Sequence, residues 1–204
     1  MRKLLFMGLP GAGKGTQAEL LEKFGFKQIS TGDIIREAFK NHDKIIQPYE
    51  ESINNGGFLP DEIIFQLIEK ALSKFSEGTK GYILDGAVRT LPQAEYVKEH
   101  NLIDTVLFFE LTEDTAYERL SSRMVCPNCK KIYSNKTTHC EKCNVDLIKR
   151  HDDSHEAIHN RFQIYKEKTE PVMPFLKENF EFIVLDANPS VEEIHKEVLK
   201  ALEL

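Results

Sequence analysis

A glycine-rich segment close to Met1 has the residue types and spacing that hold phosphate. Residues 8–16 read Gly-Leu-Pro-Gly-Ala-Gly-Lys-Gly-Thr. Gly8, Gly13 and Lys14 fit the spacing of a phosphate-binding loop, although Gly15 separates the lysine from Thr16. Glycines let successive N–H groups turn inward around an anion, and Lys14 adds a charge beside the terminal phosphates of a nucleoside triphosphate. The segment therefore predicts a binding loop made of Gly11, Ala12, Gly13, Lys14, Gly15 and Thr16.

Scarce arginines form a second group of candidate residues. Of the 27 basic residues, only seven are arginine. A guanidinium grips phosphate oxygens through two parallel hydrogen bonds, whereas a lysine acts as a point charge. A chain that otherwise uses lysine is expected to keep arginine for contacts that need this geometry. The seven positions are Arg2, Arg36, Arg89, Arg119, Arg123, Arg150 and Arg161.

All four cysteines lie between residues 126 and 143, as two Cys-x₂-Cys pairs separated by ten residues. The pairs are Cys126 with Cys129 and Cys140 with Cys143. This arrangement suits a tetrahedral Zn²⁺ site, which would be structural because four protein ligands leave no open position. Two disulfides are the alternative, but the chain shows no secretory signal and a cytoplasmic location is expected. His139 is expected to be a surface residue beside the site.

The elements that must position these residues alternate between strand and helix. Apolar runs predict strands near residues 4–7, 26–30, 81–86, 106–111 and 182–185, with helical spacing between them. This alternation is typical of a doubly wound α/β domain with a parallel sheet. Asp85 is expected at the carboxyl end of the third strand. Residues 125–150 have little helical periodicity and are predicted to form a small insertion.

Capping patterns predict where several helices begin. Thr31, Asp61 and Thr112 are expected as N-caps. Capping boxes are expected at Thr90 with Gln93, Asp153 with Glu156, and Ser190 with Glu193. Arg119 and Arg123 are four residues apart and are expected on one face of the helix that follows Thr112, where an anion would relieve their repulsion.

Length and charge narrow the class of protein. With 204 residues, the chain is expected to have one core domain with room for small insertions. The net charge of −6 does not favour general nucleic-acid binding. No run approaches the roughly 18 apolar residues of a membrane helix, so no membrane partner is expected.

These motifs resemble the adenylate kinases. The resemblance is carried by Gly-Lys-Gly-Thr at 13–16, Ser-Thr-Gly-Asp at 30–33 and Leu-Asp-Gly at 84–86, and is most specific from Met1 to about Arg161. It implies a P-loop NTPase core with a five-stranded parallel sheet, formed by residues 1–30, 61–123 and 161–204. Residues 31–60 would form a monophosphate-binding insertion and residues 124–160 a lid with the Cys₄ zinc site. The implied activity is reversible, Mg²⁺-dependent phosphoryl transfer, ATP + AMP = 2 ADP, by a monomer.

The resemblance also implies roles for individual residues. Asp85 would orient water on Mg²⁺, and the paired acids Asp152 and Asp153 would support the arginines. The ATP site would include residues 11–16, Arg119 and Arg123. The AMP site would include Thr31, Arg36, Arg89, Gln93, Arg150 and Arg161. The catalytic set would be Lys14, Arg89, Arg119, Arg123, Arg150 and Arg161.

Two alternatives remain open at this point. The family motif Asp-Gly-Phe-Pro-Arg is replaced by Asp-Gly-Ala-Val-Arg at residues 85–89, which removes an aromatic wall and a rigid turn. A kinase for UMP or CMP is therefore a second hypothesis. The third is a P-loop ATPase whose Cys₄ ribbon binds nucleic acid or protein. It predicts a basic, aromatic ribbon, but residues 125–150 contain several lysines and only Tyr133 as an aromatic residue.

Overall fold

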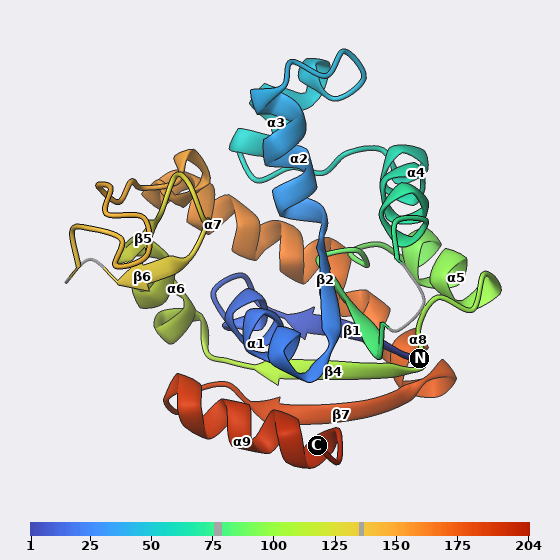
Figure 1. Cartoon of the computed structure of the whole chain (residues 1–204). Coiled ribbons are helices and arrows are strands. Elements are labelled where there is room, and N and C mark those ends of the chain that lie inside the picture. The colour runs from blue at the N-terminus through green and yellow to red at the C-terminus, as the bar shows by residue number, and fades with distance from the viewer. Residues whose placement is uncertain (76–78, 135–136) are drawn as a thin grey trace.

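A five-stranded parallel sheet forms the centre of the molecule (Figure 1). The computed structural model describes residues 1–75, 79–134 and 137–204. The strand order is β2-β3-β1-β4-β7. The strands are β1 (Arg2–Gly8), β2 (Phe26–Ser30), β3 (Gly81–Asp85), β4 (Thr105–Glu110) and β7 (Glu181–Asp186). The predicted α/β fold and all five predicted strands are confirmed.

Helices cover both faces of this sheet, which explains why residues 4–7 of β1 are an unbroken apolar run. Leu4 and Phe6 point into one core cluster, with α1, α6, α7 and α9. Leu5 and Met7 point into the other, with α2, α4, α5 and α8. The helices are α1 (Lys14–Leu21), α2 (Thr31–Lys40), α3 (Glu50–Asn54), α4 (Asp61–Leu72), α5 (Leu91–Glu99), α6 (Glu113–Ser121), α7 (His155–Ile164), α8 (Met173–Asn179) and α9 (Val191–Ala201).

Two groups of elements extend beyond the sheet and its covering helices. In Figure 1, the outer end of α2 and the short α3 rise above the sheet, and a small hairpin lies beside α6 and α7. The hairpin pairs β5 (Arg123–Val125) with β6 (Ile132–Ser134) in antiparallel register. Short 3₁₀ turns occur at Glu22–Phe24, Gln47–Tyr49, His151–Asp153 and Glu170–Val172, and Tyr165–Thr169 forms one π-helical turn.

Three of the predicted N-caps are wrong, because tertiary contacts use their side chains. Ser30 caps α2, while the Thr31 hydroxyl donates to the Gly86 carbonyl at 2.8 Å. Pro60 precedes α4, and the Asp61 carboxylate accepts a hydrogen bond from Gln93. Ser154 caps α7, and Asp153 pairs with Arg123, so the predicted box with Glu156 does not form.

The other capping predictions are confirmed wholly or in part. Thr112 caps α6, and Ser190 with Glu193 forms a complete capping box at α9. Thr90 caps α5, but the Gln93 side chain accepts from Arg89 N–H, so only half of that box is present. The prediction that Arg119 and Arg123 share a helix is wrong. Helix α6 ends at Ser121, and Arg123 begins β5.

Over the described parts of the chain, none of the helices combines the length and the apolar character needed to cross a membrane.

Candidate active site and metal site

The glycine-rich segment forms a tight loop between β1 and α1, as predicted. A side chain at Gly8 would place its Cβ 2.4 Å from the Phe109 carbonyl oxygen on β4, so only glycine fits. Gly13, at the start of α1, has a φ of +84°, which other residues rarely adopt. The Lys14 Nζ donates to the carbonyls of Gly8 and Leu9, each at 2.8 Å. The loop therefore holds the lysine side chain at the carboxyl end of β1.

One cavity of about 790 Å³ opens beside this loop. Its wall includes six of the seven arginines, together with Lys14 and Asp85. Arg2 is the exception, because its guanidinium donates to the Leu202 carbonyl near the C-terminus. The predicted site residues in the wall are Gly11, Gly13, Lys14, Gly15, Thr16, Arg36, Asp85, Arg89, Arg119, Arg123, Arg150 and Arg161. Residues far apart in the sequence thus converge on one space.

Basic side chains outnumber acidic ones in the described wall of this cavity. The pKa of Lys14 is lowered to about 8, mainly by burial, and Arg89, Arg161 and Arg123 act in the same direction while Asp85 opposes them. Burial, with nearby arginines, also lowers the pKa of Arg89 and of Arg150 to about 10. Each cation is held where its charged form is destabilised by burial and by like charges. An anion in the cavity would relieve both effects.

Asp85 is an acid placed among these cations. It ends β3, beside Phe6 of β1 and Ser30 of β2 in the sheet register. Gln28 on β2 donates to its carboxylate at 3.1 Å. Burial raises the pKa of Asp85, although Lys14 acts in the opposite direction. A buried carboxylate at the carboxyl end of a parallel strand, next to a phosphate loop, supplies the hard oxygen that Mg²⁺ prefers.

A chain of ion pairs links Arg36 on α2 to Arg161 on α7. Arg36 pairs with Asp33 at 2.6 Å and lies 3.8 Å from Asp152. Asp152 lies 3.4 Å from Arg161, which also lies 3.3 Å from Asp153. Burial by itself would raise the pKa of Asp152, but Arg161, Arg36 and other arginines lower it overall. These carboxylates hold the two arginines at the cavity wall.

Arg119 occupies a different part of the wall. Its guanidinium donates to the carbonyls of Ala187, Asn188 and Pro189 in the loop between β7 and α9. Burial lowers its pKa. Arg119 and Arg123 are therefore both in the cavity wall as predicted, but on separate elements.

Three residues predicted for the nucleotide sites are not part of the cavity wall in the described chain. Ala12 belongs to the glycine-rich loop, but its side chain is fully buried. Thr31 is buried against Gly86. Gln93 is 2% exposed, and its amide contacts Asp61 and the Arg89 N–H. The side chains of Thr31 and Gln93 bond to Gly86 and Arg89, which do line the cavity.

Phe58 is a wall residue that the sequence interpretation missed. Its ring lies 5.0 Å from the Arg89 guanidinium carbon, a cation–π distance. Ala87 and Val88, which replace the Phe-Pro of the family motif, are both buried in the core. An aromatic residue is thus present beside Arg89, but it comes from another segment. Two glycines, Gly56 and Gly57, precede Phe58, but nothing in the sequence indicates where its ring points.

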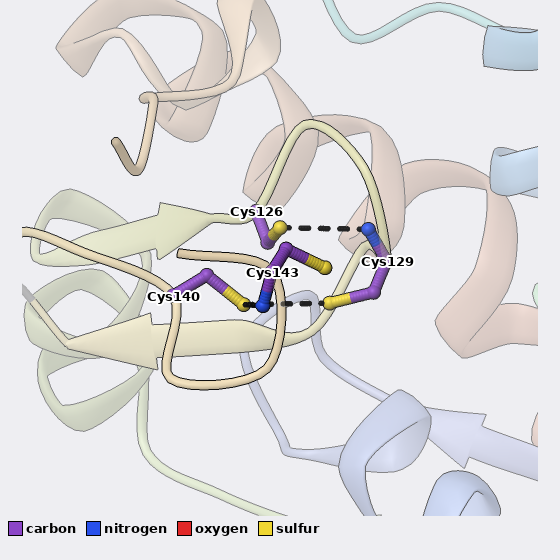
Figure 2. A group of neighbouring side chains, drawn as sticks. All are labelled: Cys126, Cys129, Cys140 and Cys143. Carbon is purple, nitrogen blue, oxygen red and sulfur yellow. Dashed lines mark hydrogen bonds between the residues drawn. The ribbon is translucent and has the colours of Figure 1, made fainter. Parts of the chain in front are cut away.

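The four cysteine sulfurs converge at the tip of the hairpin (Figure 2). All lie within 4.8 Å of one another, and Cys129 and Cys140 are 3.6 Å apart. Zn–S bonds of about 2.3 Å in a tetrahedron separate sulfurs by about 3.8 Å, whereas a disulfide needs about 2.05 Å. Backbone N–H groups of Cys129 and Cys143 donate to Cys126 and Cys140. The cluster is compatible with zinc.

His139 does not join the cysteine cluster. Its Nε2 lies 2.8 Å from Asp146, and both side chains are exposed. The sequence interpretation of His139 as a surface residue is confirmed.

Comparisons with known proteins agree with this site. A family model described as adenylate kinase matches residues 6–181. The adenylate kinase of Kosmotoga olearia is 37% identical over 212 residues, covering 98% of each chain. That of Fervidobacterium nodosum is 38% identical over 205 residues, covering 95% of this chain and 94% of the relative. That of Petrotoga mobilis is 35% identical over 212 residues, covering 98% and 97%.

These relatives are all adenylate kinases, so they do not favour the UMP or CMP kinase hypothesis. The match to the family model extends over both the phosphate loop and the cysteine hairpin. Adenylate kinases use ATP, AMP and Mg²⁺. Because the match covers nearly the whole chain at more than 30% identity, this protein belongs to the adenylate kinase family and is a nucleoside-monophosphate kinase, a phosphotransferase.

Proposed function

We propose that the cavity holds ATP and AMP with their phosphates end to end, and that phosphoryl transfer occurs between them, next to Lys14 and the six arginines of the cavity wall. The observation that supports this proposal is the convergence of these seven cations on one space beside the glycine loop. The phosphates of two nucleotides, together with carboxylates such as Asp85 and Asp33, would offset most of this positive charge.

The ATP phosphates would occupy the loop formed by residues 11–16. Lys14 currently donates to two carbonyls, so phosphate oxygens would replace these acceptors. Arg123 would reach the phosphates from β5. Arg119 would contribute at the side of the cavity where the loop after β7 supplies Pro189 and Val191 to the wall.

The AMP phosphate would bind on the side of the cavity opposite the ATP site, between Arg36 and Arg89. Arg150 and Arg161 would lie where the phosphates of the two nucleotides meet. Asp33 and Asp152 neutralise Arg36 in the structure, and the AMP phosphate would compete with them. Thr31 and Gln93 are proposed near the base. For Gln93 to read the adenine edge, its amide would have to leave Asp61 or Arg89.

The reaction needs no nucleophile from the protein. Phosphoryl transfer passes through a loose transition state whose charge spreads over the equatorial oxygens, so positioned cations supply most of the catalysis. The charge on the transferred phosphoryl group would be stabilised by Lys14, Arg123, Arg150 and Arg161. Arg89 would hold the acceptor phosphate in line. Mg²⁺, when bound, neutralises charge on the β- and γ-phosphates, and Asp85 is proposed to orient its water ligands.

We also propose that the cysteine cluster binds one structural Zn²⁺. The sulfur spacing supports this assignment, because four thiolates at tetrahedral distances leave no position for substrate. The hairpin has a small core around Cys126, Cys140 and Leu147, so metal binding would contribute much of its stability. Residues 31–60 and 124–160 are proposed as the monophosphate-binding insertion and the lid. The monomeric state and the cytoplasmic location stay predictions.

A coupled assay with AMP, UMP, CMP and GMP as acceptors tests the proposal. We expect AMP to have the highest kcat/KM, by at least about tenfold. Equal or greater activity with a pyrimidine monophosphate would contradict the assignment of AMP to this cavity.

A further inference from the structure

Thr169 lies where the long helical segment after the lid changes its winding. Helix α7 ends at Ile164, and Tyr165–Thr169 forms a π-helical turn in which the Glu170 N–H donates to the Tyr165 carbonyl, five residues back. Pro171 follows within the next turn. Because proline has no N–H and its ring displaces the carbonyl four residues earlier, a regular α-helix cannot continue through this point. Turns of this kind occur frequently at functional sites.

The Thr169 side chain makes a specific contact across the fold. It is 4% exposed, and its hydroxyl donates to the Arg89 carbonyl at 3.1 Å. Both Tyr165 and Thr169 belong to the cavity wall. The π-turn thus places a hydroxyl against the main chain of an arginine 80 residues away.

The peptide groups on both sides of Arg89 are held by side chains. Its N–H donates to Gln93 Oε1 at 2.7 Å, while its carbonyl accepts from Thr169. Gln93 is held in turn by Asp61, at 2.6 Å. Asp61 begins α4, directly after the insertion proposed for residues 31–60. Thr169 follows α7, which carries Arg161. Arg89 is therefore bonded to elements next to both the proposed monophosphate-binding insertion and the proposed lid.

The Arg89 side chain is directed by the same segment. Its Nε donates to the Gly86 carbonyl at 3.1 Å, and its guanidinium lies over Phe58. A guanidinium that must hold a phosphate in line with its donor tolerates little displacement, since a shift of about 1 Å costs about 100-fold in rate. A rigid main chain at Arg89 is the condition for this alignment.

We propose that Thr169 is a positioning residue for the acceptor phosphate: its hydroxyl fixes the Arg89 main chain, and Arg89 aims at the phosphate. This inference rests on the proposed role of Arg89 in AMP binding. It adds a residue that has no direct part in holding ATP and no charge of its own.

Replacing Thr169 with valine tests the proposal, because valine keeps the branched shape and removes the hydroxyl. We expect KM for AMP to rise about tenfold, since a buried carbonyl loses its partner and Arg89 loses one anchor. We expect KM for ATP to stay within about twofold. Thr169→Ser retains the hydroxyl and should restore KM for AMP. Thr169→Ala serves as a second hydroxyl-free variant if the valine form does not fold.

Thr105→Val is the matched control. Thr105 is also a buried threonine, and its hydroxyl donates to Glu181 at 2.7 Å, at the other end of the sheet from the phosphate loop. Its loss should lower the melting temperature without changing KM for AMP. If the Thr169 variants lowered the melting temperature but left KM for AMP within about twofold, Thr169 would be only structural and the proposal would be wrong.

A double-mutant cycle with Arg89→Ala separates this inference from the proposed function. If Thr169 acts through Arg89, adding Thr169→Val to Arg89→Ala should change KM for AMP by less than about twofold. Two independent, multiplying effects would overturn the proposal. If Arg89→Ala alone left AMP kinetics unchanged, the role of Arg89 would fail. If Arg89→Ala were damaging while Thr169→Val had no effect, only the role of Thr169 would fail.

Discussion

Arg123, the first residue of the cysteine hairpin, forms a bidentate ion pair with Asp153. Arg123 Nε lies 2.8 Å from one carboxylate oxygen of Asp153, and Nη2 lies 2.5 Å from the other. Their side chains are 11% and 1% exposed. Arg123 begins β5, and Asp153 lies in the 3₁₀ turn shortly before α7, so this pair joins the start of the hairpin to the C-terminal part of the proposed lid.

Asp153→Asn should destabilise the protein by about 3 kcal/mol, because it leaves a buried guanidinium without a compensating charge. Urea unfolding measures the change. Glu141→Gln is the control, since Glu141 makes only a long, exposed pair with Lys131, at 3.9 Å. Its effect should be below about 0.5 kcal/mol. Equal effects of the two substitutions would show that the Arg123–Asp153 pair does not stabilise the fold.

Lys14→Ala and Arg89→Ala should each lower kcat/KM at least about 100-fold, equivalent to about 2.7 kcal/mol of transition-state stabilisation. Both remove a cation from the wall of the cavity. Steady-state kinetics with ATP and AMP measure the loss. Arg2→Ala is the matched control, because Arg2 contacts the C-terminal residues outside the cavity. Near-normal rates for both cavity variants would mean that the site has been assigned wrongly.

The activity should fall at alkaline pH as Lys14 loses its proton. Protonated Lys14 carries the charge that binds phosphate, and burial lowers its pKa to about 8 in the free enzyme. Because kcat/KM for ATP follows the free enzyme, it should decline with a slope of one as pH rises above about 8. Arginine stays charged in this range, so Lys14→Arg should move the decline to higher pH. A wild-type profile that is flat to about pH 9.5 would contradict this explanation.

The purified protein should contain about one zinc per chain. Elemental analysis measures the metal, and thermal unfolding with and without a chelator measures its contribution to stability. Cys129→Ser should lower both, because it removes one of four thiolates. His139→Ala should change neither, since His139 pairs with Asp146 on the surface. Absence of metal, together with unchanged stability in chelator, would refute a structural zinc site.

Short patterns in the sequence were sufficient for the parts of the site that local geometry decides. The glycine loop depends on backbone conformations that only glycine adopts, as at Gly8 and Gly13. In each Cys-x₂-Cys turn the two cysteines are only three residues apart, so the turn itself brings their sulfurs close together. The strands of the sheet were visible because both of its faces are buried, which requires continuous apolar runs.

Local patterns failed where a side chain had a better partner far away in the chain. Thr31, Asp61 and Asp153 were each predicted to cap a helix, yet each bonds to another segment. In each case the residue beside it, Ser30, Pro60 or Ser154, takes the N-cap position. Hydrogen-bond partners 30 to 55 residues away cannot be identified from spacing alone.

The sequence by itself therefore determined the fold class, the phosphate loop, the cysteine cluster and the list of arginines, because residue type and short spacing carry that information. Only the tertiary structure decided how the arginines are held. Arg123 lies on a strand and pairs with Asp153, and Arg89 is fixed by Gln93, Thr169 and Phe58. These contacts join segments that meet only when the sheet, the hairpin and α7 have packed together.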